Sequence, residues 1–253
     1  MNKLHDVTTG SLEELLNLLR DKAFLLLKYY KMYNQPFNII NSVDNEMLHA
    51  CMYNTMCTGS GGSGWDTLDK GESKGSDRCQ SRKCLVCKAK VMFFLDVCPE
   101  CNSGNLKDIA DSRWGISSTS HLKYQGQLKS YRLTLVEPEE NNFSCKKFRL
   151  RVWSIDADNE HLMAYAEGQN KQKSKGINFM PLSESFYMSK PCLHLDAILP
   201  ISSIRGKVKI NYFDPENNVP VDLPKEYSRT TEEVMQAKAK TWGKDRGNVT
   251  RRK

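Results

Sequence analysis

The chain has 253 residues, of which 39% are hydrophobic and 26% are charged, and its formal net charge at pH 7 is +7. These values describe a folded globular protein and exclude a disordered or fibrous one. The sequence has no run of about 18 apolar residues and no apolar segment at its start, so it predicts neither membrane spanning nor export. We therefore expect a cytoplasmic protein.

Two helices are predicted near the N-terminus. A capping-box sequence at Ser11 opens the first, whose leucines repeat at helical spacing up to about Tyr33. Asp44 is the expected N-cap of the second helix, which covers 45–56 and carries Glu46.

A glycine-rich segment over 58–64 precedes a group of charged side chains. Glycine's backbone entropy excludes a regular element there, so this segment is either a flexible linker or a loop that lets two backbones approach closely. Asp66, Glu72 and Lys74 follow. On an extended strand Glu72 and Lys74 project from the same face, because side chains repeat every second residue, and Asp66 can curl back to share a metal ion.

These three groups match the needs of metal-dependent phosphodiester cleavage. Carboxylates hold Mg²⁺ against the phosphate, and a cation or base positions and activates the attacking water. The plainer interpretation of the same residues is a solvated charged loop.

Four cysteines form two Cys-x2-Cys pairs, Cys84 with Cys87 and Cys98 with Cys101, separated by ten residues. This spacing predicts a zinc ribbon, in which each pair offers two thiolates from a tight turn. Closed four-cysteine sites are structural, so we expect Zn²⁺ to brace an inserted subdomain over 79–105 and to take no part in catalysis. The other five cysteines are expected to be small buried groups.

Basic side chains accompany the cysteines. Lys83, Lys88 and Lys90 lie beside them in the sequence, where their charges offset that of a doubly negative zinc tetrathiolate centre. The sequence leaves open whether this subdomain also touches DNA.

The rest of the chain predicts strands and two further helices. Alternating polar and apolar residues predict antiparallel strands over 131–137 and 148–155, and two more strands are expected over 192–199 and 206–213. Helices are expected over 161–173 and 230–240. Helices followed by a mixed, mainly antiparallel sheet make an α+β fold. We expect one domain over 1–253, with the ribbon as an insertion and a basic tail over 236–253.

The order Asp66, Glu72-x-Lys74 resembles the signature of the PD-(D/E)XK nuclease superfamily, and in particular that of type II restriction endonucleases. Glu46 is similar in placement to a further acidic residue that such enzymes carry on the preceding helix. The resemblance implies a restriction-endonuclease-like core, Mg²⁺ bound by Asp66 and Glu72, water activated by Lys74, and site-specific cleavage of double-stranded DNA by a homodimer. The chain departs from the pattern in having no proline before Asp66 and few apolar residues in the Glu72 strand.

A rival acidic group follows the two central strands. Asp156, Glu167 and Gln169 resemble a Glu-x-Gln variant of the same signature, found in some restriction enzymes. The residues around Glu167 are rich in helix formers, which disfavours a strand that presents both side chains together.

Several polar and basic side chains are candidates for DNA contacts, since arginine often binds guanine and lysine binds phosphate. They are Arg113, Trp114, Lys123, Lys171 and Lys173. The segment 238–253 also has seven basic residues against one acidic residue, which suits phosphate binding but equally a solvated terminus.

Two other functions remain open at this stage. The chain could be a non-enzymatic zinc-ribbon DNA-binding protein, which would hold DNA without cutting it. It could also be a zinc-ribbon factor for RNA processing or translation, which would prefer RNA.

Overall fold

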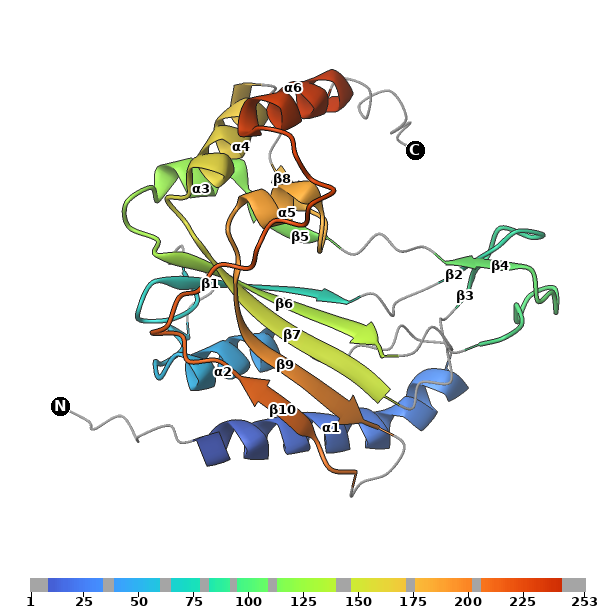
Figure 1. The fold of residues 1–253 in the computed structure, drawn as a ribbon. Coiled ribbons are helices and arrows are strands. Elements are labelled where there is room, and N and C mark those ends of the chain that lie inside the picture. Colours follow the sequence, from blue (N-terminus) through green and yellow to red (C-terminus); the bar gives the residue numbers. More distant parts are fainter. Residues whose placement is uncertain are drawn as a thin grey trace.

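A five-stranded sheet forms the centre of the protein (Figure 1). The computed structural model describes residues 9–33, 39–59, 65–77, 82–91, 95–108, 113–139, 147–171, 176–201 and 206–242. The sheet has the order β1 (Gly71–Asp77), β6 (Ser130–Pro138), β7 (Lys147–Asp156), β9 (Cys192–Pro200) and β10 (Lys209–Tyr212). β1 is parallel to β6 and the other pairs are antiparallel. The predicted α+β fold with a mixed, mainly antiparallel sheet is confirmed.

Two helices cover one face of this sheet, α1 (Thr9–Met32) and α2 (Ser42–Met52) (Figure 1). The leucines of α1 share one core with alternate residues of β7, which are Phe148, Leu150 and Val152. Apolar residues that repeat every 3.6 positions in the helix and every second position in the strand thus form one core.

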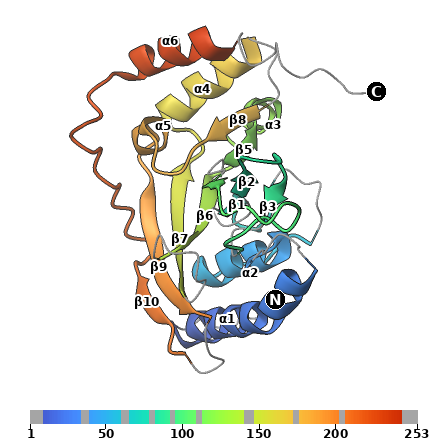
Figure 2. The ribbon, with the colours of Figure 1, turned by 90° about the vertical axis from the view of Figure 1, so that its right-hand side faces the viewer.

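The opposite face carries a two-stranded sheet and four helices. These elements are β5 (Trp114–Ser117), β8 (Gly176–Phe179), α3 (Ser118–Lys123), α4 (Glu160–Lys171), α5 (Glu184–Met188) and α6 (Thr231–Trp242). Trp114, Trp153 and Phe186 pack their rings together at the centre of this second core, with centroids between 5.3 and 6.0 Å apart. Helices therefore lie on both sides of the central sheet (Figure 2).

A separate three-stranded antiparallel sheet contains β2 (Arg82–Cys84), β3 (Lys90–Val91) and β4 (Leu106–Asp108) in the order β3-β2-β4. It lies beside the main body in Figure 1 and faces the viewer in Figure 2. Leu95 packs against both its small core and the core under α1. Among the described helices, none combines the length and the apolar character that a membrane span requires.

The predicted starts of the two N-terminal helices are wrong. α1 already includes Thr9, so Ser11 lies inside the helix rather than at its cap. The cap of α2 is Asn41, whose side chain accepts the backbone N–H of Asp44 at 2.9 Å while the Asp44 carboxylate accepts that of Asn41 at 3.0 Å. Asp44 is therefore the third helical residue of a capping box. α2 also ends one turn early, before the chain reverses through a positive φ of 45° at Asn54.

The other predicted helices and strands are present with small shifts in their ends. The segment 107–123, which the sequence did not assign, contains the end of β4, then β5 and α3. Several predictions concern residues outside the described part of the chain, among them 60–64 of the glycine-rich segment, Lys173 and the tail after 242.

Candidate active site and metal centre

β1 is an edge strand of the main sheet, with β6 as its one neighbour among the described strands. α2 and β5 both contact it, and α2 reaches it on the Ser73 side. Glu72 and Lys74 alternate with the buried Ser73, so the expected strand presents both charged side chains on one face.

A tight reversal brings Asp66 back onto this strand. The backbone N–H groups of Asp66 and Thr67 both donate to the Gly71 carbonyl, at 2.9 and 3.2 Å. The Ser73 N–H then donates to Asp66 Oδ2 at 2.7 Å. Backbone hydrogen bonds therefore hold Asp66 against the start of β1. Asp66 curls back toward the strand, as expected.

The buried guanidinium of Arg132 on β6 stabilises this reversal by binding two of its residues. It donates to Thr67 Oγ1 at 2.9 Å, pairs with Asp69, and stacks 3.7 Å from the ring centroid of Tyr53. Burial alone raises the pKa of Asp69, but hydrogen bonds from Arg132 and Thr67 outweigh burial and lower it. A Cβ atom at Gly71 would lie 2.4 Å from Arg132 Cζ, so a larger residue here would displace the guanidinium from its partners.

A buried histidine joins α2 to the sheet. His49 is fully buried, and its Nδ1 and Nε2 atoms lie 2.8 Å from Ser73 Oγ and Thr134 Oγ1 respectively. Burial and the nearby charge of Arg132 lower the pKa of His49 to about 3, so the imidazole is neutral and has one donor and one acceptor for the two hydroxyls. This link explains why the buried position 73 of β1 carries a polar side chain.

Glu46 on α2 joins the same group of charges. Burial raises its pKa, the charge of Asp66 raises it further, and Lys74 lowers it. Burial also raises the pKa of Glu72; Lys74 opposes this, and Asp66 and Glu46 add to it. Lys74 Nζ lies 2.5 Å from Glu72 Oε1. The four residues singled out in the sequence therefore interact electrostatically, although they come from a helix, a turn and a strand.

The four cysteines of the ribbon meet at one point. Their Sγ atoms all lie within 4.8 Å of one another, and Cys84–Cys101 and Cys87–Cys98 are each 3.5 Å apart. Zn–S bonds of about 2.3 Å in a tetrahedron place sulfur atoms about 3.8 Å apart. The predicted cysteine frame thus has the geometry of a site that could hold zinc. In the described part of the chain no other group of three or more potential ligands is gathered this closely.

The two cysteine turns share one backbone design. Lys88 N donates to Cys84 O at 3.1 Å, and Asn102 N donates to Cys98 O at 2.8 Å. Lys88 and Asn102 both have positive φ, of 67° and 55°. Each turn therefore reverses immediately after its second cysteine and directs two sulfur atoms to the same side. The other described cysteines, Cys51, Cys57 and Cys192, are buried or half-buried free thiols, as expected.

One of three comparisons with known proteins found a match. The family model of the MamI restriction endonuclease matches residues 31–232, which include both the acidic group and the cysteine frame. The chain belongs to the MamI restriction endonuclease family. No curated protein and no solved structure is significantly similar to it.

The structure of this MamI family member separates the candidate DNA contacts. Arg113, Lys123 and Lys171 are exposed. Trp114 is fully buried and its indole N–H donates to Thr134 O at 2.8 Å, so it is a core residue and has no surface to offer DNA.

The rival acidic group is not assembled. Residues 160–171 form α4, as the helix-forming residues predict. Glu167 is exposed whereas Gln169 is 5% exposed, so the two side chains lie on different faces of the helix.

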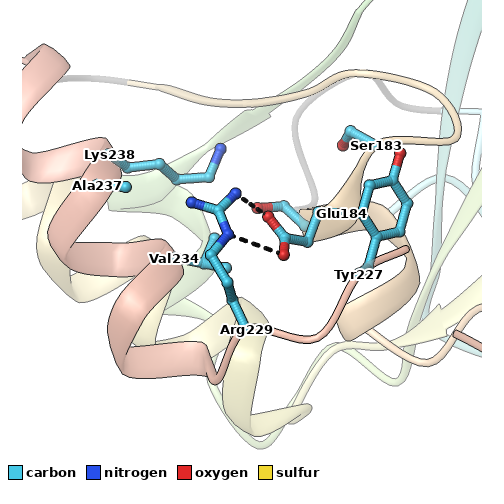
Figure 3. A pocket seen from close by; sticks show the side chains of 8 residues that line it. Ser183, Glu184, Tyr227, Arg229, Val234, Ala237 and Lys238 are labelled. Atoms are coloured by element: carbon cyan, nitrogen blue, oxygen red, sulfur yellow. Dashed lines mark hydrogen bonds and ion pairs between the residues drawn. The ribbon is translucent and has the colours of Figure 1, made fainter. Parts of the chain in front are cut away.

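A pocket of about 390 Å³ lies between α5 and α6 (Figure 3). Arg229 and Glu184 form a two-pronged ion pair at its wall, and Lys238 extends from α6 over the same space. None of the site residues predicted from the sequence lines it, so it is separate from the acidic group.

His49 and Arg132 of this MamI family member were not among the site residues predicted from the sequence. The signal for Arg132 lies in the alternation of β6, where Arg132 and Thr134 share the face that turns toward α2. A buried arginine on a mainly apolar strand indicates a buried partner of opposite charge.

Proposed function

We propose that this MamI family member is a type II restriction endonuclease that hydrolyses phosphodiester bonds of double-stranded DNA at a specific sequence with Mg²⁺. The observation that carries the proposal is the electrostatic interaction of Glu46, Asp66 and Glu72 with one another and with Lys74 at one edge of the sheet.

The carboxylates of Asp66 and Glu72 are the proposed Mg²⁺ ligands, with Glu46 beside them. Burial raises the pKa of Glu46 and of Glu72, and like charges raise both further, so the protein holds negative charges together at a cost. A divalent cation removes that cost, and carboxylate oxygens are the ligands that Mg²⁺ prefers. When bound, Mg²⁺ polarises the scissile phosphate and lowers the pKa of an attacking water.

Lys74 is the proposed residue that orients the attacking water and offsets charge on the phosphate. The Glu72 carboxylate, 2.5 Å away, holds its ammonium group at the acidic site. The Ser73 N–H bond to Asp66 keeps both strand residues in register with the turn. The buried contacts of His49 and Arg132 position this unit against α2 and β6.

The cysteine frame is the proposed site of a structural Zn²⁺, with all four positions taken by protein ligands. It braces the ribbon as an insertion within a single nuclease domain. Arg113, Lys123 and Lys171 remain candidate DNA contacts, and the homodimer remains an expectation from the resemblance.

The decisive experiment incubates the purified protein with plasmid DNA and Mg²⁺, with and without a chelator, and sequences the fragment ends. Discrete fragments that disappear with the chelator are expected, and their ends would give the recognition site. Intact plasmid under all Mg²⁺ and Mn²⁺ conditions would contradict the proposal.

The geometry of the cysteine frame also suits a second candidate, a zinc-ribbon protein that binds DNA without cutting it. That candidate predicts specific DNA retention that Asp66→Asn leaves unchanged, together with no cleavage by the wild-type protein. The plasmid assay therefore separates the two functions.

A further inference from the structure

Three lysines form a single row across the ribbon sheet. In the strand register Lys83 on β2 lies opposite Lys90 on β3 and also opposite Lys107 on β4. Residues directly opposite in neighbouring strands point to the same face of a sheet. All three side chains are exposed.

The pleat of the sheet fixes the side on which this row lies. The neighbouring residues Cys84, Val91 and Leu106 make up the small core of the ribbon on the other face. A slip of one residue would bury the lysines and expose this core, so the row is held outward.

Repulsion between the three lysines of this row destabilises the ribbon sheet when no partner is bound. Neighbouring strands lie about 4.8 Å apart, and like charges directly opposite one another destabilise a sheet. Lys83, Lys90 and Lys107 make no ion pair, hydrogen bond or ring contact through their side chains within the described part of the chain. Lys88 differs, because its Nζ donates to Leu85 O at 2.6 Å within the cysteine turn.

We propose that the row of Lys83, Lys90 and Lys107 binds the sugar–phosphate backbone of duplex DNA. This inference rests on the proposed function and adds a binding surface to it. The row spans about 10 Å over three strands. Each strand of duplex DNA carries one phosphate per about 3.4 Å of helix axis, so a few consecutive phosphates face the row.

The ribbon is connected on both sides to elements of the acidic site, so a DNA contact on the ribbon can position the duplex for cleavage. The ribbon follows β1, which carries Glu72 and Lys74, and precedes β5, which contacts β1. Leu95 also packs against the core under α1. Phosphate contacts set the register of a duplex and carry no sequence information of their own. A DNA backbone bound to the ribbon therefore fixes the orientation in which the duplex reaches the acidic site.

The test replaces the row in the full-length zinc-loaded protein by Lys83→Gln, Lys90→Gln and Lys107→Gln. The affinity for a duplex that contains the recognition site is measured against salt concentration, with Ca²⁺ in place of Mg²⁺ so that cleavage does not intervene. Each lost phosphate contact removes about 0.9 from the slope of log affinity against log salt, so the triple variant should lose about 2.7. Each single variant should lose about 0.9, which keeps the test valid if the triple variant fails to fold.

A matched control removes the same charge elsewhere, by Lys28→Gln, Lys209→Gln and Lys225→Gln, all exposed and outside the ribbon. Its slope should equal that of the wild-type protein. Zinc content and melting temperature are measured for every variant. A folded row variant with the wild-type slope overturns the proposal. Loss of zinc at an unchanged slope also overturns it, because the lysines would then serve only the metal centre.

The two proposals fail in different ways. If the wild-type protein cuts DNA and the row variants keep its salt slope, the ribbon surface is wrong and the nuclease function stands. If the wild-type protein neither binds nor cuts any duplex, both are wrong.

Discussion

The cysteine frame and the acidic group are neighbours in sequence but are built in opposite ways. Each cysteine turn is closed by its own backbone, so the metal site needs few distant residues. The acidic group draws on α2, a turn and β1, and is held by His49 and Arg132 beneath it. Spacing along the chain therefore specifies the first site, whereas tertiary packing specifies the second. Changes in each region should consequently have separable effects.

The largest expected effect follows loss of the metal from the ribbon. Cys98→Ser removes a buried ligand, and structural zinc sites contribute about 10–16 kcal/mol of binding free energy at pH 7. We expect one equivalent of zinc in the wild-type protein and none in the variant, as measured by metal analysis. Hydrogen exchange should show loss of protection in β2–β4 while β6 and β7 stay protected. Loss of protection throughout the main sheet would contradict the separation of the two regions.

Lys74→Ala should affect catalysis alone. Removing one preorganised electrostatic group lowers kcat by about 10²–10³-fold, and DNA binding with Ca²⁺ and the zinc content should remain unchanged. Lys70→Ala is the matched control, because Lys70 is an exposed lysine in the preceding turn and has no carboxylate partner among the described contacts. An undiminished cutting rate in the Lys74 variant would remove Lys74 from the mechanism.

His49→Gln should weaken the response to Mg²⁺ through its effect on Ser73 and α2. Changes of such supporting groups reduce metal affinity by about 10–100-fold, so the Mg²⁺ concentration for half-maximal cleavage should rise by that factor. His161→Gln is the control, since His161 is 2% exposed and its Nδ1 lies 3.4 Å from Thr231 Oγ1, between α4 and α6 rather than at the acidic group.

Both histidine variants should lose about 1–3 kcal/mol of unfolding free energy, which denaturant titration measures. Only the His49 variant should change the Mg²⁺ dependence. Equal changes in both would show that His49 acts through overall stability alone. Thr134→Ser keeps the second hydroxyl of this network and should retain the wild-type Mg²⁺ dependence.

The smallest effect is expected from pH. Burial raises the pKa of Glu72 and of Glu46, so the protein holds these protons to a higher pH than ordinary glutamates. Mg²⁺ requires the deprotonated carboxylates, and cleavage at a subsaturating concentration should therefore fall as pH is lowered through the raised pKa. A tenfold higher Mg²⁺ concentration should move the midpoint down by up to about one pH unit. Identical pH–rate profiles at both concentrations would contradict this link.

The same contrast explains how much could be predicted from the sequence. The cysteine spacing predicted a closed site because the turns that form it are local. The Glu72 and Lys74 arrangement followed from the period of a strand, whereas Glu46 was expected only from the resemblance to restriction enzymes. Arg132 lies 63 residues from Asp69 in the chain, and no local pattern connects them. Trp114 was predicted to contact DNA but is buried, because a lone aromatic residue does not indicate whether its side chain faces the core or solvent.

The parallel pairing of β1 with β6 has a consequence for how the chain folds. Gly71 pairs with Ser130, and the whole ribbon lies in the loop between them. A ribbon closed by its own turns and metal roughly halves the freely moving part of this loop, and halving a loop lowers its closure cost by about 0.6 kcal/mol. Zinc that binds early would therefore speed the pairing of β1 with β6, so the supply of metal during synthesis would influence how quickly the acidic group is assembled.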